Sequence, residues 1–171
     1  TVTLGGRRPL VAEVQALVAS STQNNPRRAS SGLDASRSAM VLAVLAARLR
    51  LPLERSEIYT ATVGGVQLRE PAADLALALA IASAATDRPL PTDLVAIGEV
   101  GLAGEVRPVS GIQRRLAEAV RRHVVERPGI HAPFPLVDNL VAEAKRLGLH
   151  VRNARSLPGA AGHAERRVAW R

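Results

Sequence analysis

Few side chains in this sequence could perform covalent chemistry. Cysteine is absent from all 171 residues, which removes thiolate catalysis, disulfides and cysteine-ligated metals together. Lys145 is the only lysine, and it falls near the end of a late amphipathic pattern. A serine–lysine hydrolase needs a desolvated lysine within hydrogen-bond reach of its serine. The sequence therefore argues against that mechanism.

Histidine is the remaining candidate for acid–base or metal chemistry, at positions 123, 131, 150 and 163. A Ser-His-Asp triad is compatible with the residue counts, but all four histidines follow the best-patterned part of the chain. His123 and His131 could join Glu126 around a metal ion, yet their spacing is not that of a compact ligand set. We expect surface histidines and no metal site.

Evenly spaced glycines at Gly98, Gly101 and Gly104 raise the possibility of phosphate binding. They lack the Gly-Lys-Ser/Thr ending of a phosphate-binding loop, and they are typical of a glycine-punctuated hairpin. We expect no nucleotide or other cofactor on this chain.

Net charge is the clearest pointer to a partner. The chain has 23 basic and 15 acidic residues, a net charge of +8, which suggests a polyanion, nucleic acid first and an anionic membrane surface second. Aromatic residues make up only 2% of the chain, so DNA binding would be phosphate-driven, sequence-neutral and salt-sensitive rather than based on stacking. Since no apolar run could span a bilayer and no signal-peptide pattern is present, we expect a cytoplasmic protein.

Hydrophobic periodicity predicts the strands and helices that would position these groups. Helices are expected over residues 34–50, 71–85, 111–123 and 136–147, and strands over residues 1–4, 8–19, 57–63, 94–98, 105–108 and 149–151. The helix from Pro71 is apolar nearly all round, which places it at the centre of the fold. Residues 20–31 are expected to form a polar loop, in which Arg27 and Arg28 lie among hydroxyl and amide groups suited to phosphate contacts.

Two helices carry arginines whose surroundings matter. Asp34 or Ser36 should cap the helix over 34–50, and Arg37 lies in its first turn, where the helix dipole disfavours a cation. Arg37 either marks a binding role or is neutralised by Asp34. On the helix over 111–123, the side chains expected to face inward are Ile112, Leu116, Ala119 and Val120, and those expected to face solvent are Arg114, Arg115, Arg121 and Arg122.

Two motifs in the middle of the chain resemble the core of the Lon protease domain. The first is Val63-Gly64-Gly65 followed by Glu70-Pro71-Ala72-Ala73-Asp74, and the second is Ala-Ile-Gly-Glu-Val-Gly-Leu-Ala-Gly-Glu-Val-Arg-Pro-Val-Ser-Gly-Ile over 96–112. In that family a Pro-Ser-Ala-Gly turn carries a serine, and a helix after the hairpin carries a lysine. The resemblance places the serine at Ala72 and the lysine at Arg115. Because alanine has no nucleophilic atom and a guanidinium stays protonated, the reactive pair is expected to be lost.

The variant of these motifs is similar to that of the bacterial RadA/Sms DNA repair proteins, with further matching motifs at residues 9–18, 25–28 and 32–40. The resemblance extends approximately over residues 7–122. It implies a mixed α/β (α+β) fold of the Lon protease-like, ribosomal protein S5 domain 2-like type, in which helices pack on a mixed sheet. We expect a catalytically inactive domain over residues 1–152 and a flexible C-terminal tail over residues 153–171.

The same resemblance implies a DNA-binding and oligomerisation domain of a DNA repair and recombination protein. The parent would be an ATP-dependent branch-migration motor, and this domain would form a homo-hexameric ring below an ATPase ring. ATP, Mg and Zn would be bound by the zinc-finger and ATPase domains of that family, whose motifs this sequence lacks. The family often has a basic residue where this chain has Gln67. The candidate DNA contacts are Arg8, Arg27, Arg28, Arg37, Arg107 and Arg115.

Two alternatives remain open from the sequence. The domain could be a pure hexamerisation scaffold whose positive charge touches no DNA, or, less favoured, an active peptidase with an unfamiliar nucleophile. Salt-dependent DNA binding would distinguish a DNA-binding domain from a pure scaffold. A serine-reactive probe would test for an active peptidase.

Overall fold

The computed structural model describes residues 1–5, 8–91 and 94–126. The helix expected over 136–147, the strand over 149–151 and the C-terminal tail over 153–171 lie outside the described residues.

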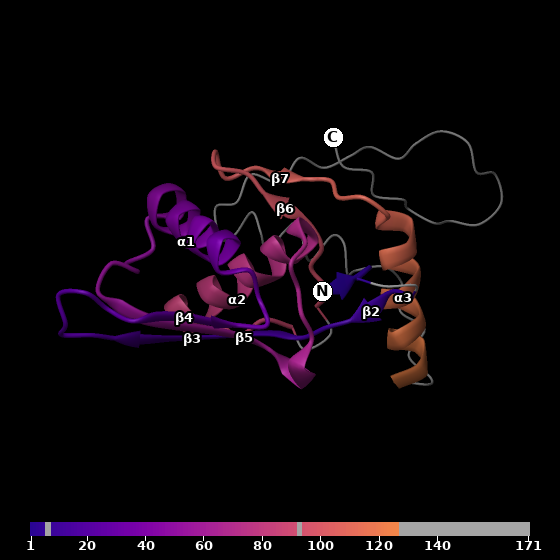
Figure 1. The fold of residues 1–171 in the computed structure, drawn as a ribbon, viewed down its shortest axis with the longest axis horizontal. Helices are drawn as coiled ribbons and strands as arrows, with labels where there is room; N and C mark the ends of the chain where they lie inside the picture. The colour runs from indigo at the N-terminus through magenta and orange to yellow at the C-terminus, as the bar shows by residue number, and fades with distance from the viewer. Residues whose placement is uncertain (6–7, 92–93, 127–171) are drawn as a thin grey trace.

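A mixed three-stranded sheet forms the base of the fold (Figure 1). Its strands are β3 (Val14–Ser20), β5 (Ser56–Thr62) and β4 (Arg28–Ser31), in the order β3-β5-β4. β3 runs antiparallel to β5, with Leu17 opposite Tyr59, and β4 runs parallel to it, with Ala29 opposite Tyr59. The mixed α/β fold with packed helices expected from the sequence is confirmed.

The strand β4 corrects the expectation of a loop over residues 20–31. Its sequence, Arg-Ala-Ser-Ser, is polar because it forms an edge of the sheet, where the hydrophobic alternation that reveals half-buried strands is weak. Ser30 is fixed to the central strand by a hydrogen bond of 2.9 Å between its hydroxyl and that of Thr60. Arg27 and Arg28 therefore lie at the start of an ordered strand.

Two short ribbons accompany the main sheet. β1 (Val2–Thr3) pairs with β2 (Leu10–Val11), and β6 (Glu99–Val100) pairs with β7 (Val106–Arg107), both antiparallel. The strand expected over 94–98 is absent from the described fold. That segment instead bonds to the start of a helix, because Gly98 donates to the Ala72 carbonyl and accepts from the Leu75 amide, each at 3.1 Å.

Three α-helices complete the described part: α1 (Ala35–Leu49), α2 (Asp74–Thr86) and α3 (Ile112–Glu126). The 3-10 turns η1 (Val63–Gly65) and η2 (Pro71–Ala73) precede α2. α1 and α2 pack together on one face of the sheet, and the β6–β7 hairpin lies beyond them (Figure 1). α3 packs against β1 and β2. No helix in the described ranges is long and apolar enough to cross a membrane.

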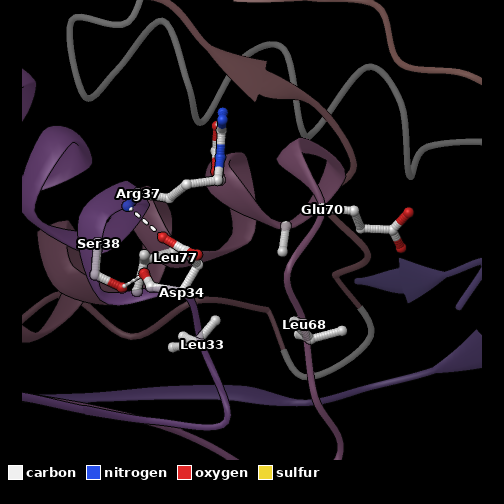
Figure 2. A pocket seen from close by; sticks show the side chains of 9 residues that line it. Leu33, Asp34, Arg37, Ser38, Leu68, Glu70 and Leu77 are labelled. Atoms are coloured by element: carbon white, nitrogen blue, oxygen red, sulfur yellow. Dashed lines mark hydrogen bonds and ion pairs between the residues drawn. The ribbon is translucent and has the colours of Figure 1, made fainter.

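The central position expected for the helix from Pro71 is confirmed. α2 contributes to two clusters of the aliphatic core: Leu77 and Ile81 pack with Leu45 of α1 and Ile58 of β5, whereas its other face joins a second cluster. Asp34 caps α1, as one of the two expected residues, by accepting the Arg37 amide at 2.9 Å. The two helices thus meet with their N-terminal ends close to the turn over 70–74 (Figure 2).

Candidate functional site

The turn Glu70–Asp74 is the place where the resemblance puts a nucleophile. Pro71 opens η2 at the first position, where its missing N–H costs nothing. Ala72 is 1% exposed and packs with Val2, Ile97 and Ala119. Its methyl group therefore lies in the core rather than in an open cleft. The position holds no nucleophilic atom.

Arg115, the counterpart of the lysine, corrects the expectation of a solvent-facing, DNA-contacting side chain, because it is 1% exposed. Its guanidinium binds both carboxylate oxygens of Glu70, at 2.9 and 2.7 Å. It also donates to the carbonyl of Val2 at 2.6 Å and to that of Ser110 at 3.0 Å. Arginine suits this place since its planar fork can satisfy several acceptors at once. Four of its five N–H groups are thus paired inside the domain, and the buried side chain offers almost no surface to a phosphate.

The same contacts stabilise the ionised form of Glu70. Its carboxylate accepts the two guanidinium bonds and the Leu4 amide at 2.9 Å. The Arg115 hydrogen bonds lower the pKa of Glu70 to about 2, against the opposing effect of burial. The carboxylate is therefore ionised at neutral pH. The pair joins β1, the turn over 70–74 and α3.

Arg37 is also engaged, but with a partner other than Asp34. Its Nε donates to Asp74 Oδ1 at 2.9 Å and its Nη2 to Asp74 Oδ2, while Glu99 lies 3.7 Å away. The Asp74 hydrogen bonds raise the pKa of Arg37. Asp74 also accepts the Val100 amide at 3.2 Å, so it does more than complement the helix dipole. One quarter of the Arg37 side chain, 26%, stays exposed.

A small cavity lies between α1 and the turn over 70–74. Its volume is about 10 Å³, which is the space of roughly one water molecule. In Figure 2, Asp34, Arg37 and Ser38 lie on one side and Glu70 lies on the other, with Leu33 and Leu68 below. A peptide or nucleotide substrate has no room in such a space.

The other four candidate DNA contacts are exposed: Arg8, Arg27, Arg28 and Arg107. They do not converge on the single chain. Arg8 lies two residues before β2, which packs against α3, whereas Arg27 and Arg28 lie at the start of β4, in the main sheet (Figure 1). Arg107 forms an ion pair of 2.5 Å with Glu105 on the β6–β7 hairpin.

Sequence reasoning missed the Arg115–Glu70 pair, although a signal for it exists. Ile112, Arg115, Leu116 and Ala119 follow the spacing of one helical face, so Arg115 belongs to the inward stripe of α3. Conversely, Val120, expected to face inward, is 45% exposed. Among the described residues, no group of three potential ligands could hold a metal ion.

Residues 54–127 match the model of the Lon protease (S16) C-terminal proteolytic domain. The chain is 57% identical over 122 residues to "DNA repair protein RadA" of Mycobacterium tuberculosis (strain ATCC 25618 / H37Rv), covering 71% of this chain and 25% of that protein. It is 51% identical over 116 residues to the Escherichia coli (strain K12) protein of the same name, covering 68% and 25%. The chain spans about a quarter of the length of the curated relatives it matches.

Proposed function

The chain belongs to the bacterial RadA family, in its Lon protease-like domain, and on this premise we propose that it acts in DNA repair as a DNA-binding and assembly module without proteolytic activity. The observation that carries this proposal concerns the two positions at which the resemblance places the serine and the lysine. Ala72 is a buried alanine, and Arg115 is held by a carboxylate and two carbonyl groups. A general base must be able to lose and regain a proton near pH 7, which a guanidinium cannot do.

The DNA-binding half of the proposal is supported by the relatives and by charge. The matching proteins are named as DNA repair proteins, and this chain has a net charge of +8. Arg27 and Arg28 stand exposed and adjacent at the start of β4, as sequence-neutral phosphate contacts require. Arg8 and Arg107 would add cations on other parts of the surface.

A pure hexamerisation scaffold is the second candidate function, and one observation favours it. Two of the six candidate DNA contacts, Arg37 and Arg115, are neutralised inside the domain by Asp74 and Glu70. The cationic surface available to DNA is smaller than the net charge suggests. In either case the whole protein is proposed to be an ATP-dependent, hexameric branch-migration motor whose ATP, Mg and Zn are bound by other domains.

The deciding experiment measures fluorescence anisotropy of a labelled duplex and of a matching single strand across a salt series. The variant is Arg27→Ala/Arg28→Ala, and the charge-matched control is Arg88→Ala/Arg121→Ala, which removes two exposed arginines elsewhere. The strand-start variant should weaken binding of both nucleic acids and reduce the slope of log affinity against log salt by about 2, whereas the control should keep the slope.

Each other outcome has a distinct meaning. If the wild-type chain binds neither nucleic acid at low salt, the scaffold function stands and DNA binding is refuted. If both variants weaken binding equally, DNA binding depends on the overall positive charge and not on a particular site at Arg27 and Arg28.

A further inference from the structure

The outer face of the main sheet is uncovered within the described part of the chain. Because side chains alternate along a strand, Val14, Ala16 and Val18 face the helices, and the intervening residues face the opposite side. That opposite side is not the polar surface usual for a solvated sheet face. Leu17 is 59% exposed at its centre. A hollow of about 350 Å³ opens there, lined among others by Gln15, Leu17, Ala29, Ser31, Tyr59 and Ala61.

A protruding apolar side chain lies on the other side of the molecule. Leu102, at the turn of the β6–β7 hairpin, is 67% exposed, the largest value among the exposed large apolar residues of the described part. Two hydrogen bonds close the turn: the Gly101 amide donates to the Glu105 carbonyl at 2.8 Å and the Gly104 amide to the Gly101 carbonyl at 2.9 Å. Arg48 of α1 donates to the Leu102 carbonyl at 3.3 Å. The hairpin and the sheet lie on opposite sides of α1 and α2 (Figure 1).

Charges around the two features are complementary. The outer face of β3 and β5 carries Glu13 just before β3 and Glu57 near the opposite end. Glu13 accepts from Gln15, and Glu57 accepts from Tyr59, and neither carboxylate forms an ion pair within the described ranges. Arg27 stands beside Glu57. Beside Leu102, Arg48 forms no ion pair within the described ranges, whereas Arg107 is paired with Glu105.

We propose that Leu102 of one copy of the chain inserts into the sheet hollow of a second copy. The hollow is larger than one leucine side chain, so the exposed Ala103 beside Leu102 can enter with it. Arg48 then approaches the carboxylates of Glu13 and Glu57. Removing Leu102 and Leu17 from water supplies the apolar centre that protein interfaces need.

The geometry makes this contact head-to-tail. A knob and a hollow on opposite sides of one molecule cannot pair by a two-fold axis, so each copy offers a free knob and a free hollow to the next. Such heterologous contacts produce rings or filaments. The inference rests on the assembly half of the proposed function and names its interface. A nucleic acid is a poorer occupant of the hollow, since none of the residues that line it carries a positive charge for a phosphate.

The first test compares self-association of the full 171-residue chain by sedimentation velocity over a concentration series. Leu102→Glu and Leu17→Glu should each weaken self-association at least about 30-fold, as loss of a central hot spot does. Leu10→Glu is the matched control, because Leu10 is 42% exposed on β2, outside both surfaces. It should assemble like the wild type. Circular dichroism checks that all three variants fold.

The second test mixes the two defective variants. Leu17→Glu keeps an intact Leu102, and Leu102→Glu keeps an intact hollow, so an equimolar mixture should form a dimer and nothing larger. A two-fold contact would give no rescue on mixing. A wild-type chain that stays monomeric at high concentration, or variants that assemble normally, would overturn the proposal.

Anisotropy with a single-stranded oligonucleotide keeps this proposal separate from the proposed function. If the wild type binds DNA but stays monomeric, the proposed interface is refuted and the proposed DNA binding stands. If the wild type assembles but does not bind DNA, the interface stands and the DNA binding is refuted. If Leu17→Glu lost DNA binding while assembling normally, the hollow would be a nucleic-acid site, and the inference would be wrong.

Discussion

Replacement of Arg115 by methionine should destabilise the fold far more than loss of a surface arginine. The guanidinium makes four hydrogen bonds, two to Glu70 and one each to the carbonyls of Val2 and Ser110. Breaking a buried ion pair from one side costs about 3–5 kcal/mol. The Glu70 side chain is 27% exposed and can be partly rehydrated, so we expect the lower end, about 3 kcal/mol.

Urea unfolding followed by circular dichroism at pH 7 measures this loss. At a denaturant slope of about 2 kcal/mol per M, it lowers the midpoint by about 1.5 M. Arg121→Met is the control on the same helix: Arg121 pairs with Glu118 at 2.6 Å but its side chain is 58% exposed, so its removal should leave the urea midpoint close to that of the wild type. Arg115→Lys should fall between the two, since an ammonium keeps the charge but not the planar fork.

The reasoning fails if Arg115→Met unfolds at the same urea concentration as Arg121→Met. It also fails if Glu70→Gln/Arg115→Met is destabilised by the sum of the two single losses, because residues that act as a pair must show coupling.

Two further predictions concern the same turn. Glu70 has a pKa of about 2 in the folded protein against an ordinary value of 4.5, so its contribution to stability is present above pH 4.5 and is lost as the pH falls toward 2. The urea midpoint of Glu70→Gln should therefore fall less steeply over that pH range than the midpoint of the wild type. Equal slopes would contradict the assigned pKa. The double variant Ala72→Ser/Arg115→Lys should hydrolyse no fluorogenic peptide, because residue 72 is buried and Glu70 would hold the lysine in its charged form. Peptide turnover above that of the wild type would show that the site can still open.

Local patterns predicted much of this fold because their causes are local. The uniformly apolar sequence of α2 can be satisfied only by burial on several sides, and it lies at the centre of the core. Asp34 caps α1 through a hydrogen bond that spans three residues. The glycines at 98, 101 and 104 punctuate a hairpin, as their spacing indicated. In each case the interacting groups lie close together in the sequence.

What could not be predicted depends on partners distant in the sequence. Arg115 meets Glu70 across 45 residues, and Arg37 meets Asp74 across 37. A charged residue on a helix gives no sign of a carboxylate brought to it by another segment, and solvent exposure is the usual outcome for arginine. The polar strand β4 was missed for a related reason, since its partner β5 lies beyond α1 in the chain.

Two ion pairs hold the turn at which the Lon protease resemblance places a serine. Glu70 and Asp74 stand at the two ends of the turn that holds Ala72, and each binds an arginine from a different helix, α3 and α1. A catalytic turn must stay open to substrate, whereas this one joins three segments and α2 into one body. The four candidate DNA contacts that remain exposed lie on separate elements: Arg8 before β2, Arg27 and Arg28 at the start of β4, and Arg107 on β7. A DNA track built from them therefore has to run across neighbouring copies, so DNA affinity should depend on assembly, and a variant that blocks the Leu102 contact should weaken DNA binding without losing any cation.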